Sequence, residues 1–327
     1  MQFVVTGGAG FIGSHLVEEL LTSNHSVLAI DNLRTGSLLN LPSHPRLRIM
    51  ERDILDITAS DLCQFGAGIR GIAHLAAIPS VQESWSDPLV THTTNLTTTL
   101  RVIQWCREMG TPRLVFASSA AVYGGRRSIS RSKRSTPEPV SPYGIQKLAS
   151  EHYGRVFTAK SAFSFVALRL FNVFGPRQPC DSPYTGVVTR FISAMRDNQP
   201  IEIHGNGRQT RDFVYVKDVA RAFHLALECN LKSQPHAVCD IGTGKPTSVT
   251  GLARTLGPFF GWRSRKIFRP GLPGDIYHSV ADVSEAAALL RFAPAYTLRQ
   301  GIEELLAKPV VRFDQPQERC VTSPNGR

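Results

Sequence analysis

The sequence has no long hydrophobic run. None of its apolar stretches approaches the roughly 18 residues that span a membrane as a helix, and a content of 42% hydrophobic and 19% charged residues is typical of a globular protein. The chain opens directly into the apolar stretch 2–6, without the basic and apolar regions of a secretory signal peptide. These absences predict no membrane partner and a location in the cytoplasm.

Cysteine pairs are also missing. The six cysteines include no Cys-x-x-Cys pair, and none joins a histidine in a spacing pattern typical of zinc sites. They are Cys63, Cys106, Cys180, Cys229, Cys239 and Cys320. We therefore expect six free or buried thiols and no metal site.

The most basic segment of the chain lacks aromatic residues. The formal net charge is +11, which on its own would be compatible with a nucleic-acid partner. Five of the positive charges lie in one short segment, as Arg126, Arg127, Arg131, Lys133 and Arg134. Because no aromatic side chain alternates with these residues to stack on bases, nucleic-acid binding is not expected.

Short apolar segments alternate with segments of helical periodicity through the first half of the chain. Strands are expected near 2–6, 26–30, 47–50, 71–75, 113–117 and 164–170. Helices are expected near 11–23, 88–109 and 142–160. This alternation predicts an α/β fold with a Rossmann-type doubly wound parallel sheet.

A glycine motif lies where the first strand gives way to the first helix. Gly8-x-Gly10-x-x-Gly13 has the spacing of a dinucleotide-binding turn. Gly7 and Gly8 permit the turn, Gly10 lets the backbone approach a pyrophosphate, and Gly13 allows close packing of the helix. The N–H groups at the helix start then face the anion. Asp31 ends the second strand and favours NAD over NADP, because it would repel a 2′-phosphate.

The pattern of the chain changes near residue 175, where turns become frequent and the elements shorten. We therefore expect two lobes. Residues 1–172 would form the NAD-binding Rossmann domain, to which 213–229 returns, and 173–212 with 230–308 would form a smaller, mixed α/β substrate-binding lobe. The polar tail at 309–327 is expected to be disordered.

Tyr143 and Lys147 stand at positions i and i+4 of an expected helix, the spacing at which two side chains meet. A free phenol has a pKa of about 10, so proton transfer near pH 7 requires roughly 4 kcal/mol of stabilisation of its anion. One positive charge about 5 Å away supplies roughly 3 kcal/mol at an effective dielectric of about 20. Lys147 and a cationic nicotinamide would together be sufficient, so the pair is a candidate for acid–base catalysis.

With these motifs the chain resembles an extended short-chain dehydrogenase/reductase of the NAD-dependent sugar epimerase/dehydratase family, over roughly residues 1–308. Within that family it is most similar to UDP-glucose and UDP-N-acetylglucosamine 4-epimerases. The resemblance implies that Tyr143 and Lys147 contact NAD. It implies further NAD contacts from Gly7, Gly10, Phe11, Ile12, Gly13, Asp31, Asn32, Asp53, Ile54, Leu75, Ala76, Ala77, Asn95 and Phe171. For Asn95, a buried link between helix and sheet is an equally open interpretation.

The segment 116–124 resembles the family's catalytic strand end and places the active hydroxyl at Ser119. This hydroxyl would hydrogen-bond the sugar 4-hydroxyl and relay its proton to Tyr143. Family dehydratases carry Asp-Glu after the hydroxyl residue and decarboxylases carry Glu, whereas this chain has Ala120 and Ala121, which cannot act as acid or base. The resemblance therefore implies reversible oxidation at C4, through a 4-keto sugar, to the C4 epimer with NAD regenerated.

The resemblance also implies a UDP-sugar site formed by Ser119, Asn172, Val187, Arg211, Arg269 and Ser279. The planar guanidinium of Arg211, within a family signature at 205–216, suits the diphosphate. A second family arginine is replaced by Leu272, so either Arg269 or the basic segment 126–134 would compensate, unless that segment is a solvated cap without a ligand. Ser279 leaves room for an N-acetyl group, which implies UDP-N-acetylhexosamines alongside UDP-hexoses.

Two alternatives to this function stay open. The excess of arginine would suit UDP-glucuronic acid, as the substrate of a 4-epimerase or a decarboxylase. A protein of another class, a non-catalytic NAD-binding scaffold or sensor, would keep the glycine motif without needing the Ser119, Tyr143 and Lys147 set. The resemblance further implies a homodimer, joined through a four-helix bundle of the helices at 88–109 and 142–160.

Overall fold

The computed structural model describes residues 1–65, 68–125, 136–179, 186–231, 235–271 and 276–307. The basic segment 126–134, Leu272 and the tail 309–327, for which the sequence suggests roles or disorder, lie outside these residues. Within the described part of the chain, no helix is both long and apolar enough to cross a membrane.

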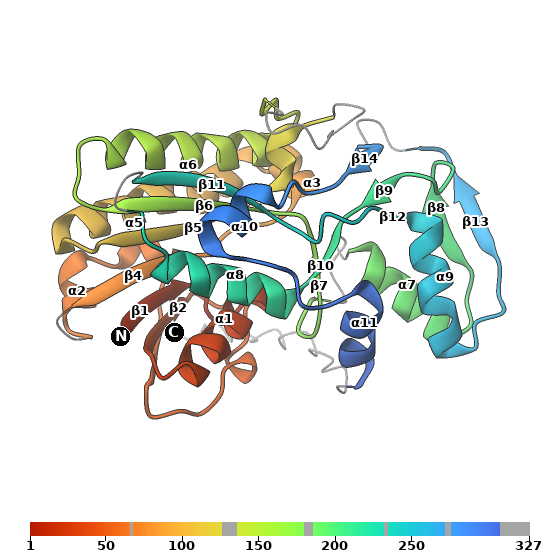
Figure 1. Ribbon diagram of the computed structural model, residues 1–327, viewed down its shortest axis with the longest axis horizontal. Helices are drawn as coiled ribbons and strands as arrows, with labels where there is room; N and C mark the ends of the chain where they lie inside the picture. The colour runs from red at the N-terminus through yellow and green to blue at the C-terminus, as the bar shows by residue number, and fades with distance from the viewer. Residues whose placement is uncertain (66–67, 126–135, 180–185, 232–234, 272–275, 308–327) are drawn as a thin grey trace, which may run out of the picture.

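A seven-stranded sheet forms the larger lobe (Figure 1). Its strands are β1 (Gln2–Thr6), β2 (Ser26–Asp31), β3 (Leu47–Glu51), β4 (Ile69–His74), β5 (Arg113–Ser119), β6 (Ser164–Leu170) and β11 (His236–Ile241). They lie in the order β11-β6-β5-β4-β1-β2-β3, and all neighbouring pairs are parallel. The Rossmann-type fold expected from the sequence is confirmed. Sheets of this kind bind ligands beyond the carboxyl ends of their strands, where the order reverses between β1 and β4.

Helices cover both faces of this sheet. One face packs against α1 (Phe11–Thr22), α8 (Val216–Glu228) and α10 (Ser284–Leu290). The other packs against α2 (Ala59–Cys63), α5 (Thr98–Met109) and α6 (Pro142–Thr158). The strands are consequently apolar on both faces: Val4 and Val5 of β1 are fully buried in opposite cores.

The helix expected at 88–109 is interrupted. A π-helical turn at Thr93–Thr97 separates α4 (Pro88–His92) from α5. Asn95 lies in this turn, where its amide accepts a hydrogen bond from the N–H of Ile78 (2.8 Å) and donates one to the Ile78 carbonyl (3.2 Å). The wider turn lets a polar side chain hold the loop after β4, a constraint that apolar periodicity does not reveal.

The smaller lobe lies beyond the carboxyl ends of the large sheet (Figure 1). Its helices α7 (Val187–Arg196), α9 (Val249–Phe260) and α11 (Leu298–Ala307) share a separate apolar core. Two small sheets pair β7 (Asn172–Phe174) with β10 (Phe213–Tyr215) and β8 (Ile201–His204) with β13 (Lys266–Arg269). A third places β9 (Thr210–Arg211) between β12 (Thr247–Ser248) and β14 (His278–Ser279).

The boundary between the lobes differs from the expected one. The sequence pattern assigns 230–308 wholly to the smaller lobe, but β11 pairs with β6 along its whole length and α10 packs on the large sheet. The chain therefore returns to the large sheet at β11 as well as at α8. The sequence of a short apolar strand does not indicate which sheet, or which edge of a sheet, the strand joins. The sequence alone could therefore not place β11.

Candidate active site

The carboxyl end of β5 and the first two turns of α6 bring Ser119, Tyr143 and Lys147 together. Ser141 caps α6 by accepting a hydrogen bond from the N–H of Gly144 (3.1 Å), which fixes the start of the helix. Tyr143 thus occupies the first turn, one turn before Lys147. The hydroxyl of Ser119, the last residue of β5, hydrogen-bonds the Tyr143 phenol.

Lys147 lies buried next to Tyr143. Its Nζ is 5.7 Å from the centroid of the Tyr143 ring and donates to the carbonyl of Ala117 (2.8 Å). The ring of Phe116 lies on another side, with its centroid 4.8 Å from Nζ. This apolar surrounding disfavours the charged ammonium, so burial lowers the pKa of Lys147 to about 7.

The pKa of Tyr143 is raised, not lowered as the spacing to Lys147 suggests. Burial raises the pKa of Tyr143 to about 12, and the hydrogen bond from Ser119 opposes that rise. Loss of hydration of the phenolate outweighs the hydrogen bond from Ser119. Proton transfer near pH 7 therefore needs further positive charge close to the phenol.

A buried polar network supports the strand end behind the site. Ser118 donates to Oε1 of Glu151 (2.5 Å), and Glu151 pairs with Arg169 (2.7 Å). Arg169 also donates to the hydroxyl of Tyr123 (2.9 Å), which donates to Oδ1 of Asp240 (2.6 Å). Burial raises the pKa of Asp240 to about 6. No sequence pattern connects these five residues, so the network that joins them was not predicted.

The glycine turn between β1 and α1 has no room for side chains. Gly7 has a φ of +68°, and a Cβ there would lie 2.7 Å from the backbone nitrogen of Ala76. A Cβ on Gly13 would lie 2.0 Å from the carbonyl oxygen of Gly7. Among the described residues, no side chain caps α1 at Gly10. A ligand can therefore approach the N-terminus of α1 over backbone that carries no side chains, which is the arrangement that binds a pyrophosphate.

Asp31, Asn32 and Asp53 lie together near the carboxyl ends of β2 and β3. Asp31 accepts hydrogen bonds from the N–H groups of Ala9 (3.0 Å) and Leu33 (2.8 Å), which join the glycine turn to the loop after β2. Burial raises the pKa of Asp31, while these backbone bonds oppose the rise. Asn32 donates to Oδ2 of Asp53 (2.8 Å). The two carboxylates leave this side of the turn suited to ribose hydroxyls and unsuited to a 2′-phosphate.

Among the other predicted cofactor contacts, Phe11 and Ile12 begin α1 and are half-buried, and Ile54 is buried after β3. Residues 75–77 follow β4 and are half-buried beside the glycine turn. Asn95 and Phe171 are buried, with 1% and 5% of their surface exposed. Asn95 donates to Oε1 of Gln146 (2.8 Å) in addition to its bonds with Ile78. These contacts favour the interpretation of Asn95 as a link between α6 and the loop after β4.

The three-stranded sheet of the smaller lobe places Arg211 beside Ser279. β14 runs parallel to β9, with Ser279 in register with Arg211. The guanidinium of Arg211 donates to the carbonyls of Thr210 (2.9 Å) and Ile276 (2.6 Å), while Ser279 is 5% exposed. The arginine expected to bind phosphate and the small residue expected to border the sugar thus belong to one surface.

Asp212 anchors this surface, although the sequence analysis did not name it as a site residue. It is fully buried, and its carboxylate accepts hydrogen bonds from the N–H groups of Thr243 (2.8 Å), Gly244 (2.8 Å) and Ala281 (3.2 Å). These bonds join Asp212, which directly follows Arg211, to the loop after β11 and to Ala281, two residues after Ser279. Its position inside the family signature at 205–216 was the one feature of the sequence that could have indicated this role.

The remaining predicted substrate residues are not all brought to this surface. Asn172 is exposed at the start of β7, and its N–H donates to the carbonyl of Asp212 (3.0 Å). Val187 begins α7. Arg269 instead belongs to another sheet, where its Nε and terminal nitrogen donate to Oε1 of Glu202 (3.1 and 2.6 Å). This pairing argues against Arg269 as a replacement for the missing second arginine.

Known proteins are similar to this chain over almost its whole length. A sequence profile described as the NAD dependent epimerase/dehydratase family matches residues 3–242. A putative UDP-glucose 4-epimerase from Methanocaldococcus jannaschii is 35% identical over 306 residues, which cover 93% of this chain and 97% of that relative.

Solved structures share the fold as well. The UDP-glucose 4-epimerase of Thermotoga maritima, crystallised with UDP-glucose, has a TM-score of 0.87 at 32% identity and covers 94% of this chain and 98% of its own. The UDP-N-acetylglucosamine 4-epimerase of Methanobrevibacter ruminantium, in complex with UDP-N-acetylmuramic acid, has a TM-score of 0.86 at 34% identity, with the same coverage of 94% and 98%. Both matches include the large sheet and the smaller lobe.

Proposed function

The chain belongs to the NAD-dependent epimerase/dehydratase family, and from this premise we propose that it is an enzyme that interconverts UDP-sugars differing in configuration at C4. The observation that carries the proposal is the meeting of Ser119, Tyr143 and Lys147 at the same edge of the large sheet as a dinucleotide-binding turn. Ala120 and Ala121 follow the serine and offer no acid for elimination. This combination supports epimerisation over dehydration.

The residues of the large lobe fit NAD. The glycine turn at Gly7, Gly10 and Gly13 would hold the pyrophosphate, and Asp31 would bind the adenosine ribose. When bound, oxidised NAD supplies the hydride acceptor and a positive charge near the phenol. Such a charge would favour the phenolate and so oppose the rise that burial causes in the pKa of Tyr143.

In this proposal Tyr143 moves one proton in each direction. With Ser119 as the bridge, Tyr143 accepts the proton of the sugar 4-hydroxyl as the 4-keto sugar forms, and it returns the proton after the ketone has turned its other face. Lys147, one helical turn away, stabilises the phenolate through its charge. Since the same residue takes and returns the proton, the reaction leaves the protein unchanged.

The smaller lobe would hold the UDP portion. Arg211 would bind the diphosphate with the planar fork that suits phosphate oxygens, next to Asn172. Ser279, its neighbour in the sheet, would border the sugar 2-substituent. Because serine is small, we propose that UDP-N-acetylglucosamine and UDP-N-acetylgalactosamine are substrates alongside UDP-glucose and UDP-galactose.

Incubation with single UDP-sugars tests the function directly. Purified protein with NAD is incubated with UDP-glucose, UDP-N-acetylglucosamine or UDP-glucuronic acid, and the products are separated by chromatography. The expected result is the C4 epimer without accumulation of NADH. Release of carbon dioxide from UDP-glucuronic acid would show a decarboxylase, and no turnover of any sugar would show a non-catalytic NAD-binding protein.

Replacing Ser279 by Tyr is expected to change the preference among sugars. The phenol would occupy the space beside the 2-substituent, so kcat/KM for UDP-N-acetylglucosamine should fall at least about 30-fold, a difference of about 2 kcal/mol, while the value for UDP-glucose changes little. The ratio of the two kcat/KM values is the measurement. Ser284→Tyr, outside this sheet on α10, is the control. An unchanged ratio in Ser279→Tyr would refute the role of Ser279.

We also propose that the protein forms a homodimer through α6 and the segment containing α4. One face of α6 exposes Ile145, Tyr153 and Val156, with 56%, 41% and 57% of their surface accessible, and Leu89 of α4 is 79% accessible. A row of exposed apolar residues at helical spacing supports an interface of packed helices.

Val156→Glu is expected to convert the dimer to a monomer, because it would bury a charge in the helix interface without a partner. Light scattering coupled to size-exclusion chromatography measures the mass. Ile49→Glu, on the edge strand β3 where Ile49 is 47% exposed, should leave the dimer intact. A wild-type protein that elutes as a monomer would contradict the proposal.

Cytoplasmic location is a further part of the proposal. Among the described residues Cys63, Cys106, Cys229 and Cys239 are free thiols, of which Cys106 and Cys239 are buried. Unpaired thiols suit a reducing compartment. Cell fractionation with an antibody to the protein measures where it resides.

A further inference from the structure

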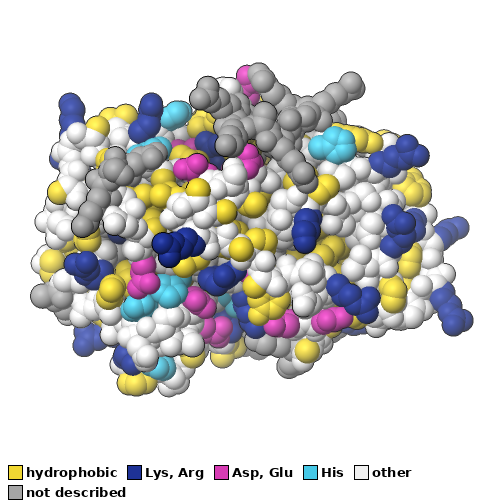
Figure 2. All heavy atoms as spheres, viewed as in Figure 1, with side chains coloured by type: hydrophobic (Ala, Val, Ile, Leu, Met, Phe, Trp, Pro, Cys, Tyr) yellow, Lys and Arg dark blue, Asp and Glu magenta, His cyan; other side chains and the backbone are white. Residues whose placement is uncertain are grey.

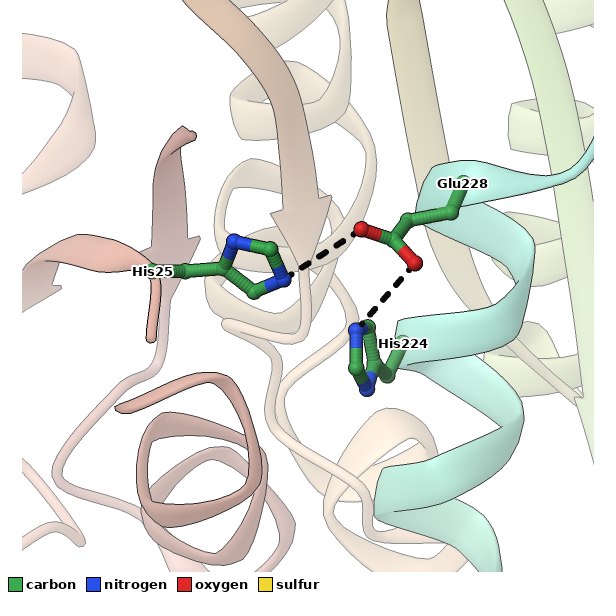
Figure 3. A group of neighbouring side chains, drawn as sticks. All are labelled: His25, His224 and Glu228. Carbon is green, nitrogen blue, oxygen red and sulfur yellow. Dashed lines mark ion pairs between the residues drawn. The ribbon is translucent and has the colours of Figure 1, made fainter. Parts of the chain in front are cut away.

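Three side chains of the kind that bind metal ions meet on the large lobe, away from the candidate active site (Figure 3). His25 directly precedes β2, while His224 and Glu228 stand one turn apart in the last part of α8. One ligand atom from each of the three lies within 4.8 Å of the others. Figure 3 shows both imidazole rings directed toward the carboxylate of Glu228.

The distances are close to those of a metal coordination shell. Nε2 of His25 lies 3.3 Å from Oε1 of Glu228, and Nε2 of His224 lies 3.5 Å from Oε2. Ligand atoms that surround a tetrahedral zinc ion at about 2.0–2.1 Å are separated from one another by roughly 3.3 Å. Two of the three separations are therefore close to those of a coordination shell, and side-chain rotations would bring the three ligand atoms, which lie within 4.8 Å of one another, around one ion.

Glu19 orients the ring of His224. Its Oε1 lies 3.1 Å from Nδ1 of His224 and accepts the proton on that nitrogen. With its one ring proton on Nδ1, the neutral imidazole would present the lone pair of Nε2 to Glu228, the arrangement by which carboxylates orient zinc-binding histidines. Nε2 of His224 is buried and has no hydrogen-bond partner among the described residues. A proton on Nε2 or a bound cation would satisfy this nitrogen beside the carboxylate oxygen.

Packing holds the ring of His25 in place. It is 8% exposed and stands edge-on to the rings of Phe3 (5.0 Å between centroids) and His224 (5.3 Å). Its Nδ1 faces the nitrogen of Met1 at 3.3 Å, which leaves Nε2 toward the cluster. The side chain of Glu228 is 39% exposed, so an ion can enter from solvent. In Figure 2, histidine side chains (cyan) lie beside acidic side chains (magenta) over the region of α1 and α8.

We propose that His25, His224 and Glu228 bind one Zn²⁺, or a divalent transition-metal ion of similar ligand preference, with a fourth position open to water. Two imidazoles and a carboxylate match that preference, and the carboxylates of Glu19 and Glu228 balance the charge of the ion. The ion would tie the connection between α1 and β2 to the end of α8. The site lies at the amino end of β2, opposite the end that carries the active site, so its role is structural.

No metal site is expected from the sequence, because the three ligands do not form a local pattern. Only His224 and Glu228 lie at a spacing that places two ligands on one helix face, and their pairing alone is ordinary. The third ligand comes from the other end of the chain. The packing of α8 beside α1 and β2 creates the cluster.

Zinc binding to tag-free protein tests the proposal. Competition with a chromophoric chelator should show one Zn²⁺ per chain bound at micromolar free zinc. The affinity should fall by about 30-fold or more in His224→Gln and Glu228→Gln, and by about 10-fold in Glu19→Gln, which removes only the orienting carboxylate. His152→Gln, which changes an exposed histidine of α6, is the matched control and should bind as the wild type does.

Thermal melts and epimerase assays complete the test. Saturating Zn²⁺ should raise the Tm of the wild type by about 3 °C or more, with no such rise in Glu228→Gln, while the epimerase activity of that variant stays at the wild-type level. Melts without metal show whether each variant is folded. Absence of stoichiometric zinc in the wild type, as expected for simple ion pairs, or unchanged zinc affinity in folded variants would overturn the proposal, whatever the outcome of the epimerase assay.

Discussion

Tyr143→Phe is expected to abolish epimerisation, with kcat reduced at least about 1,000-fold. The variant removes only the hydroxyl that would accept the proton of the sugar 4-hydroxyl, and with it the hydrogen bond from Ser119. The ring itself is 8% exposed and keeps its packing. Steady-state kinetics with UDP-glucose or UDP-N-acetylglucosamine measures kcat, and calorimetry with UDP measures binding.

Binding of UDP should be unaffected by this substitution, because the residues proposed to hold UDP are Arg211 and Asn172 in the smaller lobe. Tyr153→Phe is the matched control. Tyr153 lies on the same helix with 41% of its surface exposed, so loss of its hydroxyl should leave kcat unchanged. A Tyr143→Phe enzyme that retained more than about a tenth of the wild-type kcat would exclude Tyr143 as the group that transfers the proton.

Lys147→Met is expected to inactivate the enzyme and to stabilise the fold. The charge beside the phenol disappears, so kcat should fall about 100-fold or more. Burial places the pKa of Lys147 at about 7, against an ordinary value of 10.5, so the unfolded chain binds this proton more tightly than the folded protein does. An apolar side chain of similar length avoids that penalty. It leaves the carbonyl of Ala117 without its bond from Nζ, a smaller cost.

The stability difference should depend on pH in a defined direction. As the pH falls from about 10.5 to about 7, Lys147 becomes protonated in the unfolded wild type but stays largely neutral in the folded protein. The free energy of unfolding of the wild type therefore declines relative to that of Lys147→Met. The variant should be more stable by roughly 3 kcal/mol at pH 7 and should lose that advantage near pH 10. Urea unfolding at both pH values is the measurement. Lys160→Met, at an exposed position just after α6, should show no such dependence, and a Lys147→Met protein less stable than wild type at pH 7 would contradict the burial argument.

Burial also explains why activity and stability oppose each other at this site. The same apolar surrounding that lowers the pKa of Lys147 raises that of Tyr143. Both shifts disfavour the ion pair that proton transfer requires. The protein alone therefore holds the phenol and the ammonium close together without ionising the phenol, and we expect bound oxidised NAD to complete the site.

The local features of this protein were determined by the sequence. The turn at Gly7, Gly10 and Gly13 needs positions without a Cβ at fixed spacing, and Tyr143 and Lys147 meet because 3.6 residues make one helical turn. The alternation of apolar strands and helices specified the doubly wound sheet for the same reason. The glycine turn and the Tyr143–Lys147 pair follow from the geometry of a short stretch of chain, and the alternation of elements indicates the type of sheet but not the place of every strand in it.

Only the tertiary structure decided which distant residues share a surface and which ionisable side chains are desolvated by burial. It placed Ser279 beside Arg211, anchored both through Asp212, and paired Arg269 with Glu202 instead. It also set the direction of the Tyr143 pKa and gathered the cluster of His25, His224 and Glu228. The reason is physical: proximity across the chain and desolvation are properties of packed surfaces, and a linear pattern specifies the face that is buried but not the face that it meets.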